Sequence, residues 1–175
     1  DYSDEDPEPA GPGDMNLQGG YNMAIAVNPT NENQVMIGGT NLFRSNDGFT
    51  TSPDLSTGWI GGYGPDDFLY PNHHPDQHIM FFDPNDPTRL FTGHDGGVSV
   101  TENINGGSIA WTDLNNDYNV TQFYTVAISP IAEDDRIVGG TQDNGSPYFR
   151  FDLQGGTQGS EDVSSGDGSY AALRF

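Results

Sequence analysis

The chain repeats one pattern of apolar and polar positions three times. In each copy an apolar run is followed by a proline-containing turn, a second apolar run and a glycine. The copies span residues 24–39, 79–97 and 125–145. The proline and the glycine are nine residues apart in every copy: Pro29 and Gly38, Pro84 and Gly93, Pro130 and Gly139. Because two apolar runs joined by a short turn are typical of a β-hairpin, the pattern predicts three equivalent hairpins.

The turn residues and the spacing of the copies indicate the fold class. Asn28-Pro29 and Asp83-Pro84 favour turn initiation, and the runs around them are β-branched or aromatic. The hairpin prolines lie 55 and 46 residues apart, near the roughly 40 to 50 residues of a four-stranded propeller blade. We therefore predict an all-β fold, a β-propeller of four-stranded blades of which this chain supplies about three. The alternative is a β-sandwich with coincidental hairpins.

The predicted propeller occupies most of the chain. Residues 1–14 are acidic and rich in proline and glycine, which predicts a flexible leader, and residues 15–175 are assigned to a partial propeller. The chain begins at Asp1 without a signal-peptide pattern and ends inside a predicted strand. We therefore expect a processed secreted chain or an excised fragment whose remaining blades come from the same chain or from another.

The composition of the chain limits the classes of molecule that it can bind. The chain has 26 acidic residues against five arginines and no lysine, a formal charge of −21. Such a surface repels nucleic acid and anionic membranes and attracts cations. There are no cysteines, so no disulfide stabilises the fold. We expect calcium or another divalent metal to do so, with no organic cofactor, no nucleic acid partner and no membrane insertion.

Two stretches resemble the Asp-box, the S-x-D-x-G-x-x-x-W motif of BNR-repeat propellers such as sialidases and sortilin-like ectodomains. In the first, Ser45 and Asp47 match, the glycine comes one residue early at Gly48, and an insertion displaces the tryptophan to Trp59. In the second, Thr101 and Asn103 replace serine and aspartate, and Trp111 follows after two extra residues. The resemblance implies that each box is a turn between the outer two strands of a blade. It marks the fold and is not a catalytic site.

A longer ordered set of motifs is similar to a group of secreted bacterial BNR-like proteins, many of which carry type IX sorting domains. The matching stretches are H-x-D-x-H at 74–78, D-G-G at 95–97, Q-F-Y at 122–124, Q-D-N-G at 142–145 and G-D-G at 166–168. This resemblance implies an extracellular or cell-surface protein. It implies the architecture more than any activity.

The segment "NHHPDQHIMFF" carries three of the four histidines of the chain. If it is extended, His74, Asp76 and His78 point to the same face, because side chains alternate along a strand. Two imidazoles and a carboxylate suit zinc or another transition metal. The alternative is a polar strand end whose side chains form structural hydrogen bonds.

Asp95 and Asp143 follow the second strand of their hairpins, in the "GHDGG" and "GTQDNG" turns. Carboxylate and amide oxygens beside glycine suit Ca²⁺, and paired acids also serve in glycosidases. Aspartate and asparagine are equally ordinary turn residues. Metal binding, acid/base catalysis and turn formation therefore all stay open for these two residues.

Aromatic residues gather in the insertion before the histidine segment, "GWIGGYGPDDFLY". Trp59, Tyr63, Phe68 and Tyr70 suit stacking on sugar rings, or covering the core beneath a long loop. We predict Trp59, Tyr63 and Tyr70 as ligand-binding candidates.

Two functions remain. The first is a binding or surface-assembly module, held by cations, whose partner is a polysaccharide or a surface protein. The second is a propeller-type glycoside hydrolase that acts on a neutral polysaccharide. A sialidase is disfavoured, because its arginine clamp for the substrate carboxylate needs clustered arginines and the five here are scattered. Whether the chain is an enzyme stays open.

Overall fold

The computed structural model describes residues 15–53, 57–64, 69–118, 120–150 and 160–174. Three four-stranded antiparallel sheets make up the fold, each in sequence order from its first strand to its fourth. The fold is all-β, and the sheets are consistent with about three propeller blades, as predicted. The described part of the chain has one short 3-10 helix, η1 (Gln18–Gly20), and no helix there is long and apolar enough to span a membrane.

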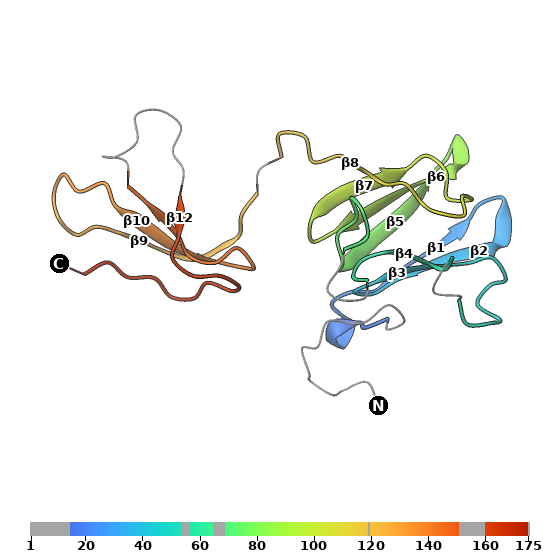
Figure 1. The fold of residues 1–175 in the computed structure, drawn as a ribbon, viewed down its shortest axis with the longest axis horizontal. Helices are drawn as coiled ribbons and strands as arrows, with labels where there is room; N and C mark the ends of the chain where they lie inside the picture. The colour runs from blue at the N-terminus through green and yellow to red at the C-terminus, as the bar shows by residue number, and fades with distance from the viewer. Residues whose placement is uncertain (1–14, 54–56, 65–68, 119, 151–159, 175) are drawn as a thin grey trace. The chain divides into compact units, whose positions relative to one another are not determined.

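Two compact units divide the chain, residues 1–117 and residues 118–175. The first unit contains two sheets (Figure 1). The strands of its first sheet are β1 (Ala24–Asn28), β2 (Asn31–Gly38), β3 (Leu42–Ser45) and β4 (Trp59–Gly61). The strands of its second sheet are β5 (Gln77–Asp83), β6 (Asp86–His94), β7 (Gly97–Thr101) and β8 (Thr112–Asp113).

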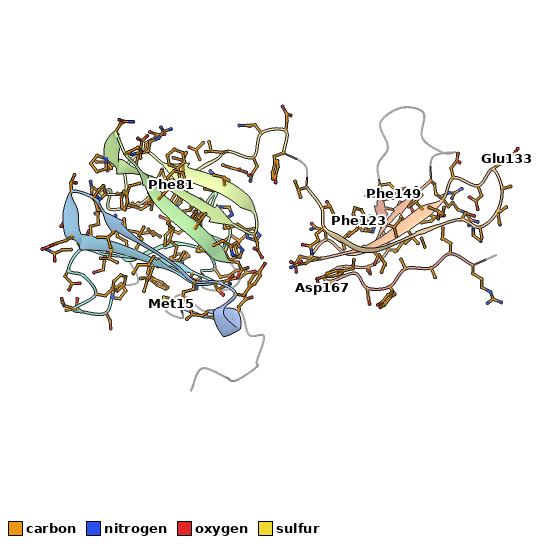
Figure 2. The ribbon with its side chains drawn as sticks, turned by 180° about the vertical axis from the view of Figure 1, so that it is seen from behind. Met15, Phe81, Phe123, Glu133, Phe149 and Asp167 are labelled. Atoms are coloured by element: carbon orange, nitrogen blue, oxygen red, sulfur yellow. The ribbon has the colours of Figure 1, made fainter. Side chains whose placement is uncertain are left out.

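The second unit contains the third sheet. Its strands are β9 (Phe123–Ile128), β10 (Ile137–Thr141), β11 (Pro147–Phe149) and β12 (Glu161–Asp162). Figure 2 shows Phe123 and Phe149 on this sheet and Asp167 on the segment that follows it. That segment is tied to β9, because Thr125 donates its hydroxyl to the carbonyl of Ser169 at 2.9 Å. The predicted leader, residues 1–14, lies outside the described residues.

The residue before each hairpin proline closes the turn in the same way. Asn28 Oδ1 accepts the N–H of Thr30 at 2.9 Å, and Asp83 Oδ1 accepts the N–H of Asn85 at 2.8 Å. Ser129 Oγ accepts the N–H of Ile131 at 3.3 Å. These bonds explain why an asparagine, aspartate or serine precedes the proline.

The third hairpin is longer than the other two. β9 ends at Ile128 and β10 begins at Ile137, and the backbone closes where Ser129 N–H donates to the carbonyl of Arg136 at 2.9 Å. Asp134 binds both the hydroxyl of Ser129 and the guanidinium of Arg136 within this connection. The connection is therefore longer than the Pro130 pattern alone indicates, and a local ion pair lies within it.

One hydrophobic core joins the two sheets of the first unit. It consists of Met36, Leu42, Ile60, Met80, Leu90, Ile104, Ile109 and Trp111. Ala24 and Ala26 of β1 pack against it, while the alternating residues Ile25 and Val27 are 69% and 50% exposed. Burial of this core drives the two sheets together, since apolar area removed from water is the main favourable term in folding.

The first Asp-box forms the turn between β3 and β4. Ser45 Oγ accepts the N–H groups of Asp47 and Phe49 at 3.1 and 2.8 Å and donates to Asp47 Oδ1 at 2.7 Å. Hydrogen bonds from the Thr51 and Ser45 hydroxyls hold the pKa of Asp47 well below its usual range. The second copy repeats the first bond in weaker form, where Thr101 Oγ1 accepts the N–H of Asn103 at 3.3 Å.

Trp111, the tryptophan of the second box, is buried and donates its indole N–H to the carbonyl of Ile60 at 2.7 Å. It thereby links the second sheet to the first. Arg44 makes a similar link, because its guanidinium donates to the carbonyls of Ile104, Gly106 and Thr57. Arg89 and Arg136 pair with acids beside their own hairpin turns, which fits a structural role.

Replacing Ser45 with alanine should lower the free energy of unfolding by about 1 to 2 kcal/mol, because two N–H groups of a partly buried turn lose their acceptor. Urea denaturation followed by tryptophan fluorescence measures the loss. Ser52→Ala, at an exposed serine nearby, is the matched control. Equal stabilities of the two variants would show that the box does not hold the turn.

Candidate ligand pocket at the histidine segment

The histidine segment is not an extended strand up to Asp76, and the predicted alternation is wrong there. β5 begins at Gln77, and Asp76 has a φ of 66°, in the left-handed region. The kink has a clear cause. The N–H groups of Asp76 and Gln77 donate to the carbonyls of Thr40 and Gly39, at 2.9 and 2.8 Å, in the loop between β2 and β3.

His74, Asp76 and His78 consequently have separate partners. His74 Nδ1 lies 3.1 Å from the carbonyl oxygen of Pro75, and His78 pairs with Asp95. Asp76 Oδ1 accepts from Gln18 at 2.9 Å and from Asn22 at 2.6 Å. No group of three histidine, aspartate or glutamate side chains is placed to hold a metal ion anywhere in the described ranges. These contacts match the structural alternative, and a metal at these residues stays a prediction.

Asp95 lies beside this segment. Its Oδ1 contacts the His78 ring and the Tyr21 hydroxyl, the latter at 3.5 Å. Burial raises the pKa of Asp76, the bond from Asn22 opposes the rise, and the negative charge of Asp95 adds to it. The two carboxyl groups therefore have different environments. Asp76 is protonated more readily than a free aspartate.

Asp143 belongs to the second unit, in a turn tied to the segment after β12. Its φ is 57°, and its N–H donates to Asp167 Oδ1 at 2.9 Å. Thr141 closes the same turn, where its N–H and hydroxyl donate to the carbonyl of Gly145 at 3.0 and 2.8 Å. The contacts of Asp143 are those of a turn residue, and a metal or catalytic role for it stays a prediction.

The predicted aromatic candidates divide by location. Trp59, on β4, meets Tyr70 edge to face with ring centres 5.1 Å apart. The Tyr70 hydroxyl donates to the carbonyl of Ile109 at 2.9 Å and accepts its N–H at 3.1 Å. Tyr63 pairs with Leu69 in an isolated β-bridge. Tyr70 therefore packs against the core and Trp59 packs on Tyr70. Phe68 lies outside the described residues.

Two buried histidines were not recognised from the sequence as parts of a site. His94 Nε2 lies 2.9 Å from Ser99 Oγ, and Ser99 in turn donates to the carbonyl of Asn72 at 3.1 Å. Because that carbonyl only accepts, the hydroxyl proton points to it and His94 must carry its proton on Nε2. His73 Nε2 contacts Thr92 Oγ1 at 3.0 Å, and its ring packs on Trp111.

Burial keeps both of these imidazoles neutral. It lowers the pKa of His94 from its ordinary value of 6.5 to about 4, with a further contribution from His74. The same cause lowers the pKa of His73 well below 6.5. The only sign of burial in the sequence was that His94 ends the apolar "LFTGH" run. Such a run does not distinguish a buried from an exposed imidazole.

A pocket of about 280 Å³ opens over these histidines. Its lining comes from the β4–β5 connection, from β6 and β7, and from the residues at and after β8: Leu69, Tyr70, Pro71, Asn72, His73, His74, His94, Gly96, Ser99, Asp113 and Asn115. The His74 and His94 rings stack with centres 5.9 Å apart. Asn115 closes one side, because its Nδ2 donates to the carbonyl of Gly96 at 2.6 Å and its Oδ1 accepts the N–H of Val98 at 3.0 Å.

Comparison with protein-family models and with curated proteins found no match for the chain. The three four-stranded antiparallel sheets are consistent with propeller blades. The likeness to BNR-repeat proteins therefore rests on the motifs and on the turns that they form.

The neutral state of His94 makes stability depend on pH. Between about pH 6.5 and about pH 4 the unfolded chain binds a proton at His94 that the folded chain does not, so folding weakens as the pH falls through this range. In His94→Gln this contribution is absent. We expect the free energy of unfolding to fall less steeply in the variant than in the wild type when urea denaturation is repeated across this range.

Comparing the two proteins at each pH cancels the change in overall charge repulsion, which both share. Ser99→Ala is the control, since it removes the partner of His94 and keeps the imidazole, so it should be less stable at every pH with the wild-type slope. Parallel pH profiles for the wild type and His94→Gln would contradict the buried neutral assignment.

Proposed function

We propose that the chain is part of a secreted BNR-type β-propeller that serves as a binding or surface-assembly module. The pocket at the histidine segment carries the proposal. His94 Nε2, Ser99 Oγ and Asn115 Nδ2 are held by one another and by backbone carbonyls, as in a preformed ligand site. The place of action is the cell surface or the extracellular space, as the motif resemblance implies.

The remaining blades are the first partners of this module. Ile25 and Val27 lie on the face of β1 turned away from the core and are largely exposed. Phe81, which Figure 2 labels on β5, is 49% exposed and stacks on Phe91 with ring centres 4.9 Å apart. Apolar strand faces of this kind are normally covered, which supports further blades from the same or another chain.

The acidic surface supports dependence on divalent cations. Arg44 is bound to backbone carbonyls, and Arg89 and Arg136 are paired with acids beside them. All five arginines of the chain still leave a net formal charge of −21. Bound Ca²⁺ would relieve the repulsion among the carboxylates.

A glycoside hydrolase for a neutral polysaccharide is the second candidate. The observation that favours it is the pairing of Asp76, whose pKa burial raises, with the nearby Asp95. Carboxyl groups with divergent environments are what acid/base hydrolysis uses. Release of new reducing ends from a bound neutral oligosaccharide would support this candidate over the binding module.

Calcium should raise the thermal midpoint of the purified chain. Binding to the folded state alone at about 100 times the dissociation constant contributes about 2.7 kcal/mol, a shift of several degrees for a protein of this size. Thermal melts with chelator, and then with added CaCl₂, measure it. NaCl matched in ionic strength is the control, and identical midpoints in the two salts would contradict cation dependence.

A further inference from the structure

We infer that the pocket over His74 and His94 binds one ring of a neutral sugar. This inference rests on the proposed binding function and specifies its ligand. The volume, about 280 Å³, suits a single sugar ring, and the lining combines apolar surface from Leu69 and Pro71 with polar groups at the rim. A sugar presents the same combination, an apolar ring face and hydroxyl groups around the edge.

The rim offers hydrogen-bond acceptors. The Pro75 carbonyl can only accept, so neutral His74 carries its proton on Nδ1, and the Nε2 of this exposed ring keeps a lone pair. Asp113 accepts the N–H of Asn115 with Oδ1 at 2.8 Å, and its side chain is exposed. Its carboxylate can still accept from a ligand. Hydroxyl groups are the donors that such a rim selects.

The floor of the pocket is neutral and rigid. His94 donates from Nε2 to Ser99, and Ser99 donates to the carbonyl of Asn72. The His74 ring stacks on His94 and lies over the backbone of Gly96. These contacts fix the position of His74 before any ligand arrives, which lowers the entropic cost of binding.

The charges at the pocket exclude acidic sugars. None of its lining residues is an arginine or a lysine, and Asp113 places a carboxylate at the rim. A uronic acid, a sialic acid or a sulfated sugar would therefore meet repulsion without a cationic partner. The specificity predicted here is for uncharged oligosaccharides.

Gly96 provides a way to displace the His74 acceptor without replacing it. A Cβ at Gly96 would lie 2.6 Å from the Cβ and Cγ of His74, so Gly96→Ala must push the imidazole away. Asp113→Asn tests the other side of the rim, since it removes the charge and nearly preserves the shape. Asp135→Asn, at an exposed carboxylate of the second unit, is the matched control.

The experiment screens the purified full chain on an array of neutral, sialylated and sulfated oligosaccharides. The tightest neutral oligosaccharide is then titrated by calorimetry into the wild type and the three variants, after circular dichroism has verified the fold of each. We expect binding to neutral glycans only, with affinity at least tenfold weaker in Gly96→Ala and in Asp113→Asn. Asp135→Asn should stay within twofold of the wild type.

Three results would overturn the inference: no neutral glycan bound, preference for the anionic glycans, or unchanged affinity in both rim variants. If a neutral glycan binds and the rim variants bind it with unchanged affinity, the proposed binding function is supported and the assignment of the ligand to this pocket is wrong. If Gly96→Ala does not fold, Asp113→Asn alone decides. The calcium melts are independent of all these outcomes, so failure of cation dependence is recognised separately.

Discussion

The first unit depends on a close approach of its two sheets at the start of β5. Gly38, the last residue of β2, has no side chain. The Gln77 side chain packs in its place, so a Cβ added to Gly38 would lie only 2.6 Å from the Cβ of Gln77. This approach brings the N–H groups of Asp76 and Gln77 within hydrogen-bonding distance of Thr40 and Gly39. Two backbone hydrogen bonds and the packing of Gln77 against Gly38 thus join the sheets at one end. The apolar core joins them along their length.

The candidate pocket is a consequence of this junction. The junction turns the chain at Asp76, which separates His74 from His78 and leaves His74 over Gly96. Gln77 then donates from Nε2 to the carbonyl of His74 at 2.8 Å, which holds the turn on its inner side. The polar residues of the segment are therefore used first to connect sheets. The pocket therefore has hydrogen-bond acceptors of His74 and Asp113 at its rim and the neutral His94 on its floor. This arrangement is better suited to binding a hydroxylated ligand than to assembling a metal site.

Much of the fold was predictable because its signals are local. The nine-residue interval from Pro29 to Gly38 reports a turn closed by the side chain before the proline and a second strand that contains the glycine, and both features recur in the other two hairpins. The site was less predictable because its geometry depends on contacts distant in sequence. Asp76 is turned by the carbonyl of Thr40, and His94 is bound to Ser99, which in turn donates to the carbonyl of Asn72. None of these contacts is recognisable from spacing along the chain. Strand alternation predicted a shared face for His74 and Asp76. The prediction failed at Asp76, because its N–H is hydrogen-bonded to Thr40, next to the first sheet.

Substitution of Gly38 by alanine tests whether the first unit depends on this junction. The added Cβ must displace Gln77 and with it the start of β5, so we expect a loss of about 1 to 3 kcal/mol in the free energy of unfolding, as for other overpacked sites. Gly107→Ala is the reference, since a Cβ there meets nothing within 4 Å. Urea denaturation of both variants, followed by the fluorescence of the buried Trp111, provides the measurement. Equal stabilities for Gly38→Ala and Gly107→Ala would contradict the claim that the fold is built on this junction.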